Sequence, residues 1–256
     1  MQLQNYIEFA WYRALAEVRA DVSRGFLGLA WWLAEPILYM GVFLLIFGII
    51  FEQREENYVS FLLCGLVIWK WFDSSLKNSA TSIQYNMSLI YQVYLPKVVF
   101  PVIAILTSTM RFALVFIVFL LFLLIIGTPI TSAWFTDLPF LLLLQLALML
   151  GLGMMLSAIV PFVPDVKFLL DNGMMLLFFL SGIFFRFNAV PERIRAYFDL
   201  NPVAVLIRSY REVLISGKHL DWGTLSTVII MALCFLLIGG LQLWKWDRLY
   251  AKKAFI

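Results

Sequence analysis

The sequence is poor in charged residues, and this scarcity is the first constraint on its class. Charged side chains make up 14% of the 256 residues, while 63% of the residues are hydrophobic. Soluble domains lie closer to a quarter charged and half apolar. The composition therefore excludes a soluble globular domain and indicates a polytopic membrane protein. The net charge of +3 is small, and no basic run is dense enough to predict nucleic-acid binding.

Residues that build metal, redox or nucleotide sites are also scarce. Cys64 and Cys234 lie far apart in apolar runs and His219 is the only histidine, so neither a disulfide framework nor a histidine metal site is predicted. The run Ser216-Gly217-Lys218 is not a phosphate-binding loop, because Glu212 stands where that loop needs a glycine. No pair of carboxylates shares a helical face inside an apolar run. We therefore expect no catalytic site in this chain.

Long apolar runs dominate the sequence. A helix that crosses a bilayer needs about 20 apolar residues. Six runs approach or exceed this length, at residues 30–51, 58–82, 98–126, 138–160, 166–185 and 223–244. We predict an all-α integral membrane protein with six transmembrane helices, which form one domain over residues 1–256. The first five spans occupy residues 30–185.

Residues 1–29 predict an amphipathic helix at the membrane surface. Apolar side chains recur at helical spacing at Leu3, Ile7, Trp11, Leu15 and Val18. The rest of the helix carries the polar side chains Gln4, Glu8, Arg13, Glu17 and Asp21. This division is typical of a helix that lies in the membrane interface. A fully solvated helix is the alternative, and Trp11 on the apolar side argues against it.

The segment 186–222 is too polar to cross a bilayer. It has room for two short helices, one at 192–198 after Pro191 and one at 203–214, which we expect to be interfacial or re-entrant. The sixth span follows, and a basic tail at 245–256 ends the chain. Six spans place both termini on one side of the membrane, and the distribution of Lys and Arg favours the cytoplasmic side.

Three patterns inside the spans predict local contacts. Aromatic side chains at Tyr39, Phe43, Phe47 and Phe51 form a slanting stripe, which fits either a surface for sugar rings or packing against lipid and other helices. Small residues at Ala147, Gly151, Gly153 and Ser157 predict close helix packing. Lys70 and Asp73 lie on one helical face and are expected to pair, while Arg111 is expected near an interface.

Several short motifs follow one another in a characteristic order over the whole chain. The motif residues are Arg19, Leu27-Gly28, Trp31-Trp32, Pro36, Gly65, Trp69, Phe72, Asn86, Leu89-Ile90, Pro96, Pro101, Pro191, Asn201-Pro202, Arg211 and Gly217. In this order and spacing they resemble the membrane subunit of the ABC exporters that move polysaccharides, namely O-antigen, capsule and teichoic acid. The chain departs from the family pattern at Tyr91, where a basic residue is frequent, and at Pro164-Asp165, where an Arg-Asp pair is usual.

The resemblance implies a permease subunit of the bacterial inner membrane. Two copies would form a pathway for an undecaprenyl-linked polysaccharide, in contact with membrane lipid. Two copies of a separate ATP-binding subunit would bind ATP and Mg and drive transport. This subunit itself would hold no cofactor and no metal.

The resemblance also implies roles for particular residues. A coupling helix that docks in the ATP-binding subunit would contain Asn86, Leu89, Ile90 and Tyr91. A gate helix and its continuation would contain Trp11, Arg19, Leu27, Gly28, Trp31, Trp32 and Pro36. The exit on the external side would include Pro191, Asn201, Pro202 and Arg211, and the aromatic stripe would guide the glycan by stacking on its sugar rings.

Two other functions stay open. A related permease for a drug, heme or a small lipid would share the six spans, but such permeases often carry a larger extracellular domain than this chain has room for. An integral membrane enzyme would be active without an ATP-binding partner, and the lack of a catalytic cluster argues against it.

Overall fold

The computed structural model describes residues 3–24, 57–187 and 190–252, together with six isolated positions between residues 34 and 45. Within these residues the chain forms helices joined by turns, and no strand is present. The prediction of an all-α protein is therefore confirmed for the described part of the chain. Most of the first predicted span, including its whole aromatic stripe, lies outside the described residues.

The helices follow the apolar runs of the sequence. They are α1 (Leu3–Arg24), α3 (Tyr58–Tyr85), α4 (Met87–Gln92), α5 (Val99–Ile125), α6 (Ala133–Ile159), α7 (Asp165–Leu180), α8 (Glu192–Asp199), α9 (Pro202–Leu214) and α10 (Trp222–Lys252). Four helices in the described residues are long and apolar enough to cross a membrane, namely α3, α5, α6 and the part of α10 from Trp222 to Asp247. The 16 residues of α7 fall short of a full crossing. The count of six spans stays a prediction.

Three boundaries of the predicted spans differ from the sequence prediction by five residues or more. Helix α6 begins at Ala133, five residues before the predicted start at 138, and it contains Pro139 in its second turn. Helix α7 ends at Leu180 instead of 185, just before Gly182, whose φ of 67° cannot continue a helix. Helix α10 continues to Lys252, so most of the predicted basic tail is helical.

Helix α3 lies at the centre of the bundle. It packs against α5, α6, α7 and α9, and it is the most buried of the four long helices. Its aromatic residues meet those of its neighbours, since Trp71 stacks on Phe112 of α5 at 4.0 Å and Trp69 contacts Phe178 of α7 at 5.6 Å. These large buried side chains fix the positions of α5 and α7 around α3.

Helices α6 and α10 cross with their backbones in close contact. A methyl group at Gly239 of α10 would lie 2.7 Å from the carbonyl oxygen of Gly151 in α6. Gly153, two residues further along, lies on the opposite side of α6, and a methyl group there would overlap Ser79 of α3. The close packing predicted from the small residues of this span is confirmed, and Gly239 is the partner that the prediction did not include.

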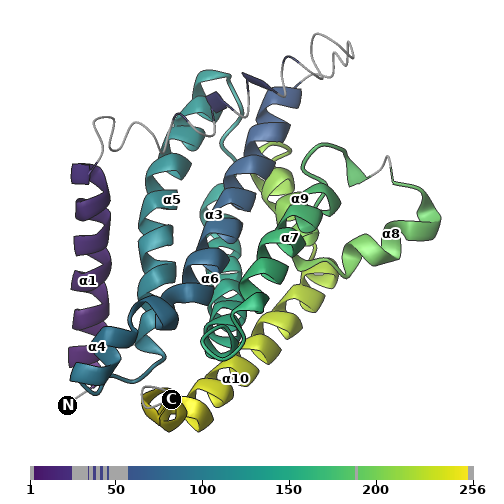
Figure 1. Cartoon of the computed structure of the whole chain (residues 1–256). Coiled ribbons are helices and arrows are strands. Elements are labelled where there is room, and N and C mark those ends of the chain that lie inside the picture. Colours follow the sequence, from purple (N-terminus) through teal and green to yellow (C-terminus); the bar gives the residue numbers. More distant parts are fainter. Residues whose placement is uncertain are drawn as a thin grey trace.

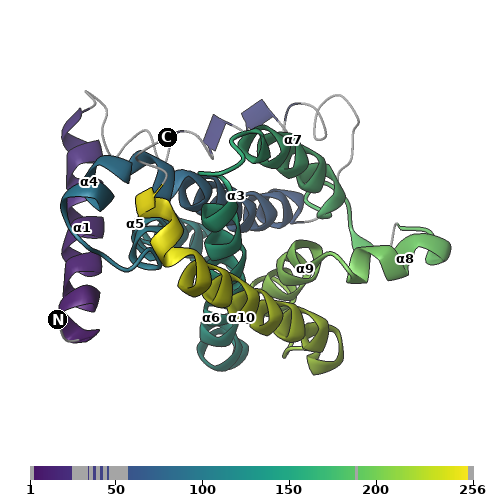
Figure 2. The same ribbon diagram turned by 60° about the horizontal axis from the view of Figure 1, so that its bottom comes forward.

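The ends of the bundle differ in what they carry. The amino terminus, α4 and the carboxyl terminus gather at one end, which we call the α4 end (Figure 1). Helix α1 lies at one edge of the molecule and α8 projects from the opposite edge (Figures 1 and 2). In Figure 2 α1 is seen along its length while α5 is seen nearly end-on, so these packed helices cross instead of running parallel.

Candidate functional site

The α4 end contains the segment predicted to couple the chain to a partner. Asn86 forms the junction between α3 and α4, where its side-chain amide donates to the Ser82 carbonyl at 2.8 Å. The Asn86 carbonyl accepts hydrogen bonds from the backbone N–H groups of Leu89 and Ile90, both at 3.1 Å. Asn86 therefore ends one helix and begins the next.

The predicted coupling residues differ in exposure. Ile90 is only 5% exposed and packs in a cluster with Ile83, Leu95 and Phe100, while Leu89 is half-buried. Tyr91 is exposed on the surface. Tyr85 and Tyr94 are exposed on the same segment, and the sequence analysis did not select them. The surface available to a partner at this end is thus rich in tyrosine, a residue favoured at interfaces.

Asp247, near the end of α10, holds the loop between α4 and α5. Its carboxylate accepts hydrogen bonds from the Tyr94 hydroxyl at 2.9 Å and from the backbone N–H of Lys97 at 3.2 Å. The buried Lys97 ammonium lies 3.7 Å from the same carboxylate and donates to the Leu95 carbonyl at 3.1 Å. A buried ammonium needs such partners, so this loop is fixed to the last helix.

Helix α1 turns its small residues toward α5. Ala10 and Ala14 are buried against Val99 and Ile103. Trp11, from the predicted gate helix, is exposed, and so is Arg19. The other predicted gate residues, Leu27, Gly28, Trp31, Trp32 and Pro36, lie outside the described residues, as do Tyr39, Phe43, Phe47 and Phe51.

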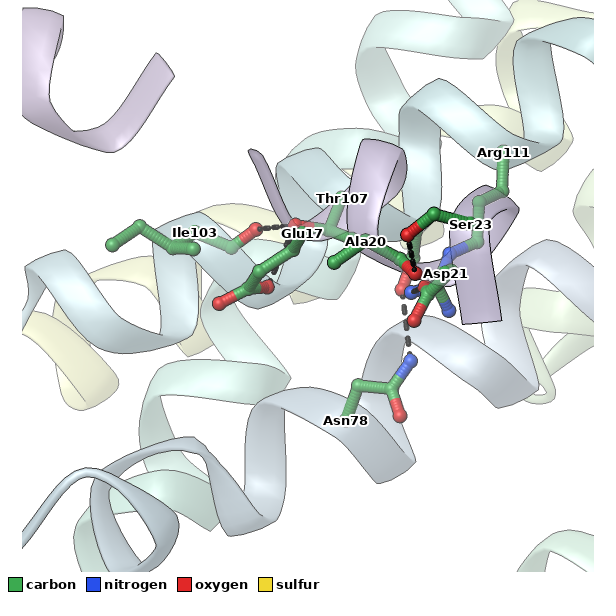
Figure 3. A network of polar contacts seen from close by, with 9 residues as sticks. Glu17, Ala20, Asp21, Ser23, Asn78, Ile103, Thr107 and Arg111 are labelled. Atoms are coloured by element: carbon green, nitrogen blue, oxygen red, sulfur yellow. Dashed lines mark hydrogen bonds and ion pairs between the residues drawn. The ribbon is translucent and has the colours of Figure 1, made fainter. Parts of the chain in front are cut away.

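Polar side chains complete the contact between α1 and α5 (Figure 3). Arg111 of α5 forms an ion pair with Asp21 of α1. One turn away the Thr107 hydroxyl donates to a Glu17 carboxylate oxygen at 3.2 Å. Glu17 also pairs with Arg13 at 3.3 Å. A cavity of about 240 Å³ lies beside this seam, between α1, α3 and α5. The polar side of α1 therefore faces the bundle in part, which the predicted division of the helix did not anticipate.

Charged side chains inside α3 also form an ion pair, between Asp73 and Lys77. The Asp73 carboxylate lies 2.8 Å from the Lys77 ammonium, one turn further along α3. Side chains at i and i+4 meet readily on a helix, so this pair is a local one. The predicted pair between Lys70 and Asp73 stays a prediction.

At the other side of the bundle, the predicted exit residues begin helices and fasten them. Pro191 stands immediately before α8, and Pro202 occupies the first turn of α9. The Asn201 side-chain oxygen accepts from the N–H groups of Val203 and Ala204 at 3.0 and 3.3 Å. Its amide nitrogen donates to the Leu180 carbonyl at 3.2 Å, so one residue caps α9 and ties it to α7.

Arg211 fastens α9 to two other segments. Its guanidinium donates to the carbonyl oxygens of Phe61 at 3.1 Å, Gly182 at 2.7 Å and Ile183 at 2.9 Å. Burial lowers the pKa of this guanidinium to about 10, which leaves it protonated at neutral pH. The guanidinium also lies 3.4 Å from the centre of the Phe61 ring. Gly65 leaves room for it, because a methyl group there would lie 2.6 Å from Nη2.

His219 ties the loop before α10 to the beginning of α6. Its ring nitrogens lie 2.9 Å from an Asp137 carboxylate oxygen and 3.3 Å from the Ser132 hydroxyl. Over the described ranges, no three His, Cys, Asp or Glu side chains come close enough together to hold a metal ion. The contacts of His219 therefore link two segments at the surface of the protein.

These features define a helical membrane protein. Helix α1 lies at one edge of the bundle, and the short helices α8 and α9 lie on the opposite side, where side-chain hydrogen bonds hold α9 in place. Residues 15–215 match the model of the ABC-2 type transporter family. The chain belongs to this family of membrane proteins, which confirms the resemblance drawn from its motifs.

Particular relatives are named for O-antigen export or for polysialic acid transport. The chain is 27% identical over 212 residues to the O-antigen export system permease protein RfbA of Klebsiella pneumoniae, covering 83% of this chain and 82% of the relative. It is 29% identical over 202 residues to RfbA of Myxococcus xanthus, covering 77% and 76%. It is 26% identical over 229 residues to the polysialic acid transport protein KpsM of Escherichia coli, covering 88% of each chain.

Proposed function

We propose that this chain is the channel-forming permease subunit of an ATP-driven exporter that moves a lipid-linked polysaccharide across the bacterial inner membrane. The observation that carries the proposal is its membership of the ABC-2 type transporter family, together with similarity over most of its length to permeases named for O-antigen and polysialic acid export. A drug, heme or small-lipid permease is the less favoured function, because these relatives are named for polysaccharides.

The active assembly contains two copies of this chain and two copies of an ATP-binding subunit. The permease family has no catalytic role of its own, so ATP and Mg bind to the partner. The partner docks at the α4 end, where Tyr91 and its exposed neighbours are accessible. Both termini then lie on the cytoplasmic side, in keeping with the bias of basic residues.

A long glycan can move through such a permease only if no single site holds it tightly. Aromatic rings offer stacking surfaces for sugar rings without deep pockets, and the stripe predicted from the sequence at Tyr39, Phe43, Phe47 and Phe51 would supply such a surface. The undecaprenyl carrier reaches the pathway from the bilayer. Trp11 and Ile7 of α1 are exposed. Since an interfacial helix presents such residues to the lipid headgroups, we expect the carrier to arrive from this side.

Deleting the gene from its host tests this function. We expect surface polysaccharide to be lost and lipid-linked glycan to accumulate inside the cell, because synthesis continues while export stops. Both are measured by immunoblot of surface and lysate fractions, and a plasmid copy of the gene should restore the surface signal. Normal surface polysaccharide in the deletion strain would show that the chain does something else.

A further inference from the structure

A large cavity opens beside α9, on the side of the bundle away from α1. It has a volume of about 980 Å³ and lies between α8, α9, the residues after α7 and the first turns of α3 and α10. Sites for small molecules usually occupy roughly 300–1,000 Å³. We call this space the α9 cavity, and it has room for more than one sugar ring.

Aromatic rings and arginines alternate on the wall of the α9 cavity. Arg208 lies 4.3 Å from the centre of the Phe187 ring, and Arg186 lies 5.5 Å from the Phe61 ring, which Arg211 also covers. Phe185 and Phe198 meet edge to face at 5.7 Å. Stacked guanidinium groups hold the rings in fixed orientations, so the wall presents rigid apolar faces next to hydrogen-bond donors.

The charges that line the cavity balance one another. Among the described residues that line the cavity, the arginines are Arg186, Arg208 and Arg211 and the carboxylates are Asp199, Glu212 and Asp221, which together give a formal charge of zero. Arg208 lies 3.1 Å from Asp199, so the opposite charges are close together. Burial raises the pKa of Glu212 even though Arg208 and Lys218 act against it, which places this carboxyl in a partly dehydrated setting.

We propose that the α9 cavity binds a short run of uncharged sugar residues of the exported polysaccharide. This assignment rests on the proposed function and narrows its substrate class. Sugar hydroxyls need donors and acceptors side by side, and the arginines and carboxylates supply both. The apolar faces of sugar rings pack on aromatic rings such as Phe187 and Phe185. An acidic glycan would bring its carboxylates next to Asp199, Glu212 and Asp221, which a cavity without net positive charge does not offset.

Binding to the purified full-length protein in phosphatidylcholine nanodiscs tests the assignment. The probes are uncharged tetrasaccharides of glucose, galactose, mannose and rhamnose, and a tetramer of sialic acid, each followed by saturation-transfer NMR. We expect at least one uncharged tetrasaccharide to bind and the sialic acid tetramer to give no signal. Phe187→Ala should weaken binding of the uncharged probe about tenfold, as loss of one aromatic anchor does. Phe135→Ala, at an exposed phenylalanine on α6, is the matched control and should bind as the parent protein does.

A double variant with altered charge should gain binding of the charged probe, and an unfolded protein could not show such a gain. Asp199→Asn combined with Glu212→Gln leaves three arginines and one carboxylate, a formal charge of +2. This variant should lose affinity for the uncharged probe and acquire binding of the sialic acid tetramer. The assignment is overturned if no uncharged tetrasaccharide binds, if the parent protein prefers the sialic acid tetramer, or if the variants bind as the parent does. If the deletion strain stops exporting glycan but the purified protein binds none of the probes, the proposed function stands and the assignment of the cavity is refuted.

Discussion

Single glycines decide how closely the two most extensively packed helices approach. Helices α6 and α10 cross where Gly151 faces Gly239, and each lacks the side chain that would hold the backbones apart. Between membrane helices, van der Waals packing replaces the hydrophobic effect as the source of association, so such contacts carry much of the stability. Gly239 and Gly240 are neighbours in the same helix, and only Gly239 faces α6 at this distance.

We expect Gly239→Ala to destabilise the protein by about 2 kcal/mol. The new methyl group would lie 2.7 Å from the Gly151 carbonyl oxygen and 2.9 Å from Met154 Cβ, so the two helices must separate. The free energy of unfolding is measured by titration with SDS in mixed micelles.

Gly240→Ala is the matched control for this prediction. No heavy atom lies within 4 Å of a methyl group at this position, so the variant should be as stable as the parent protein. Equal stability of the two variants would mean that the helices are not in close contact at Gly239.

At the scale of an element, α1 is held to the bundle by a mixed contact. Small apolar residues pack at its middle, while Glu17 and Asp21 reach Thr107 and Arg111 of α5 further along (Figure 3). The ion pair between Arg111 and Asp21 is about one-third exposed, so it contributes on the order of 1 kcal/mol. That is enough to decide how often the last turns of α1 separate from α5.

Charge reversal tests this attachment. Arg111→Asp places two carboxylates together, so the backbone amides of α1 should exchange with deuterium about tenfold faster, which corresponds to ~1.4 kcal/mol. The double variant Asp21→Arg with Arg111→Asp restores an opposite pair and should return exchange to the parent rate. Hydrogen–deuterium exchange with mass spectrometry measures both. Arg19→Asp reverses an exposed charge on the same helix and should change nothing. If the double variant exchanges as fast as Arg111→Asp, the pair does not hold α1.

The elements themselves were largely predictable, because hydrophobic runs, prolines and capping residues are local signals. Asn201-Pro202 marked the start of α9, and Pro191 marked the start of α8. The early start of α6 was missed, since the turn that opens at Gly127 was expected to continue to residue 137, whereas the helix already begins at Ala133. The polar side of α1 was predicted, but its partner on α5 lies 90 residues away and leaves no local signal.

At the scale of the whole molecule, hydrogen bonds between residues far apart in the sequence stabilise both sides of the bundle. Asp247 joins the end of α10 to the loop after α4 across 150 residues of sequence, and Arg211 joins α9 to α3 across a similar separation. Arg211 was selected from its motif, yet its three carbonyl partners could not be foreseen from sequence. The exposed surface at the α4 end likewise depends on tertiary packing, which buries Ile90 and leaves Tyr91 accessible.

That difference in exposure decides how docking of the ATP-binding subunit should be tested. A charge at Ile90 would lie inside the cluster of Ile83 and Phe100, so loss of binding would only report loss of folding. Tyr91→Asp changes an exposed side chain, and we expect it to weaken co-purification of the ATP-binding subunit about tenfold, as removal of an aromatic interface anchor does. Tyr197→Asp, on the exposed surface of α8 at the opposite edge of the molecule, is the control and should leave co-purification unchanged. Both variants should keep the thermal stability of the parent protein, because neither disturbs a buried contact. If Tyr91→Asp binds the ATP-binding subunit as well as the parent protein does, the docking surface is not at the α4 end. The assignment of that end to the cytoplasmic side would then lose its support.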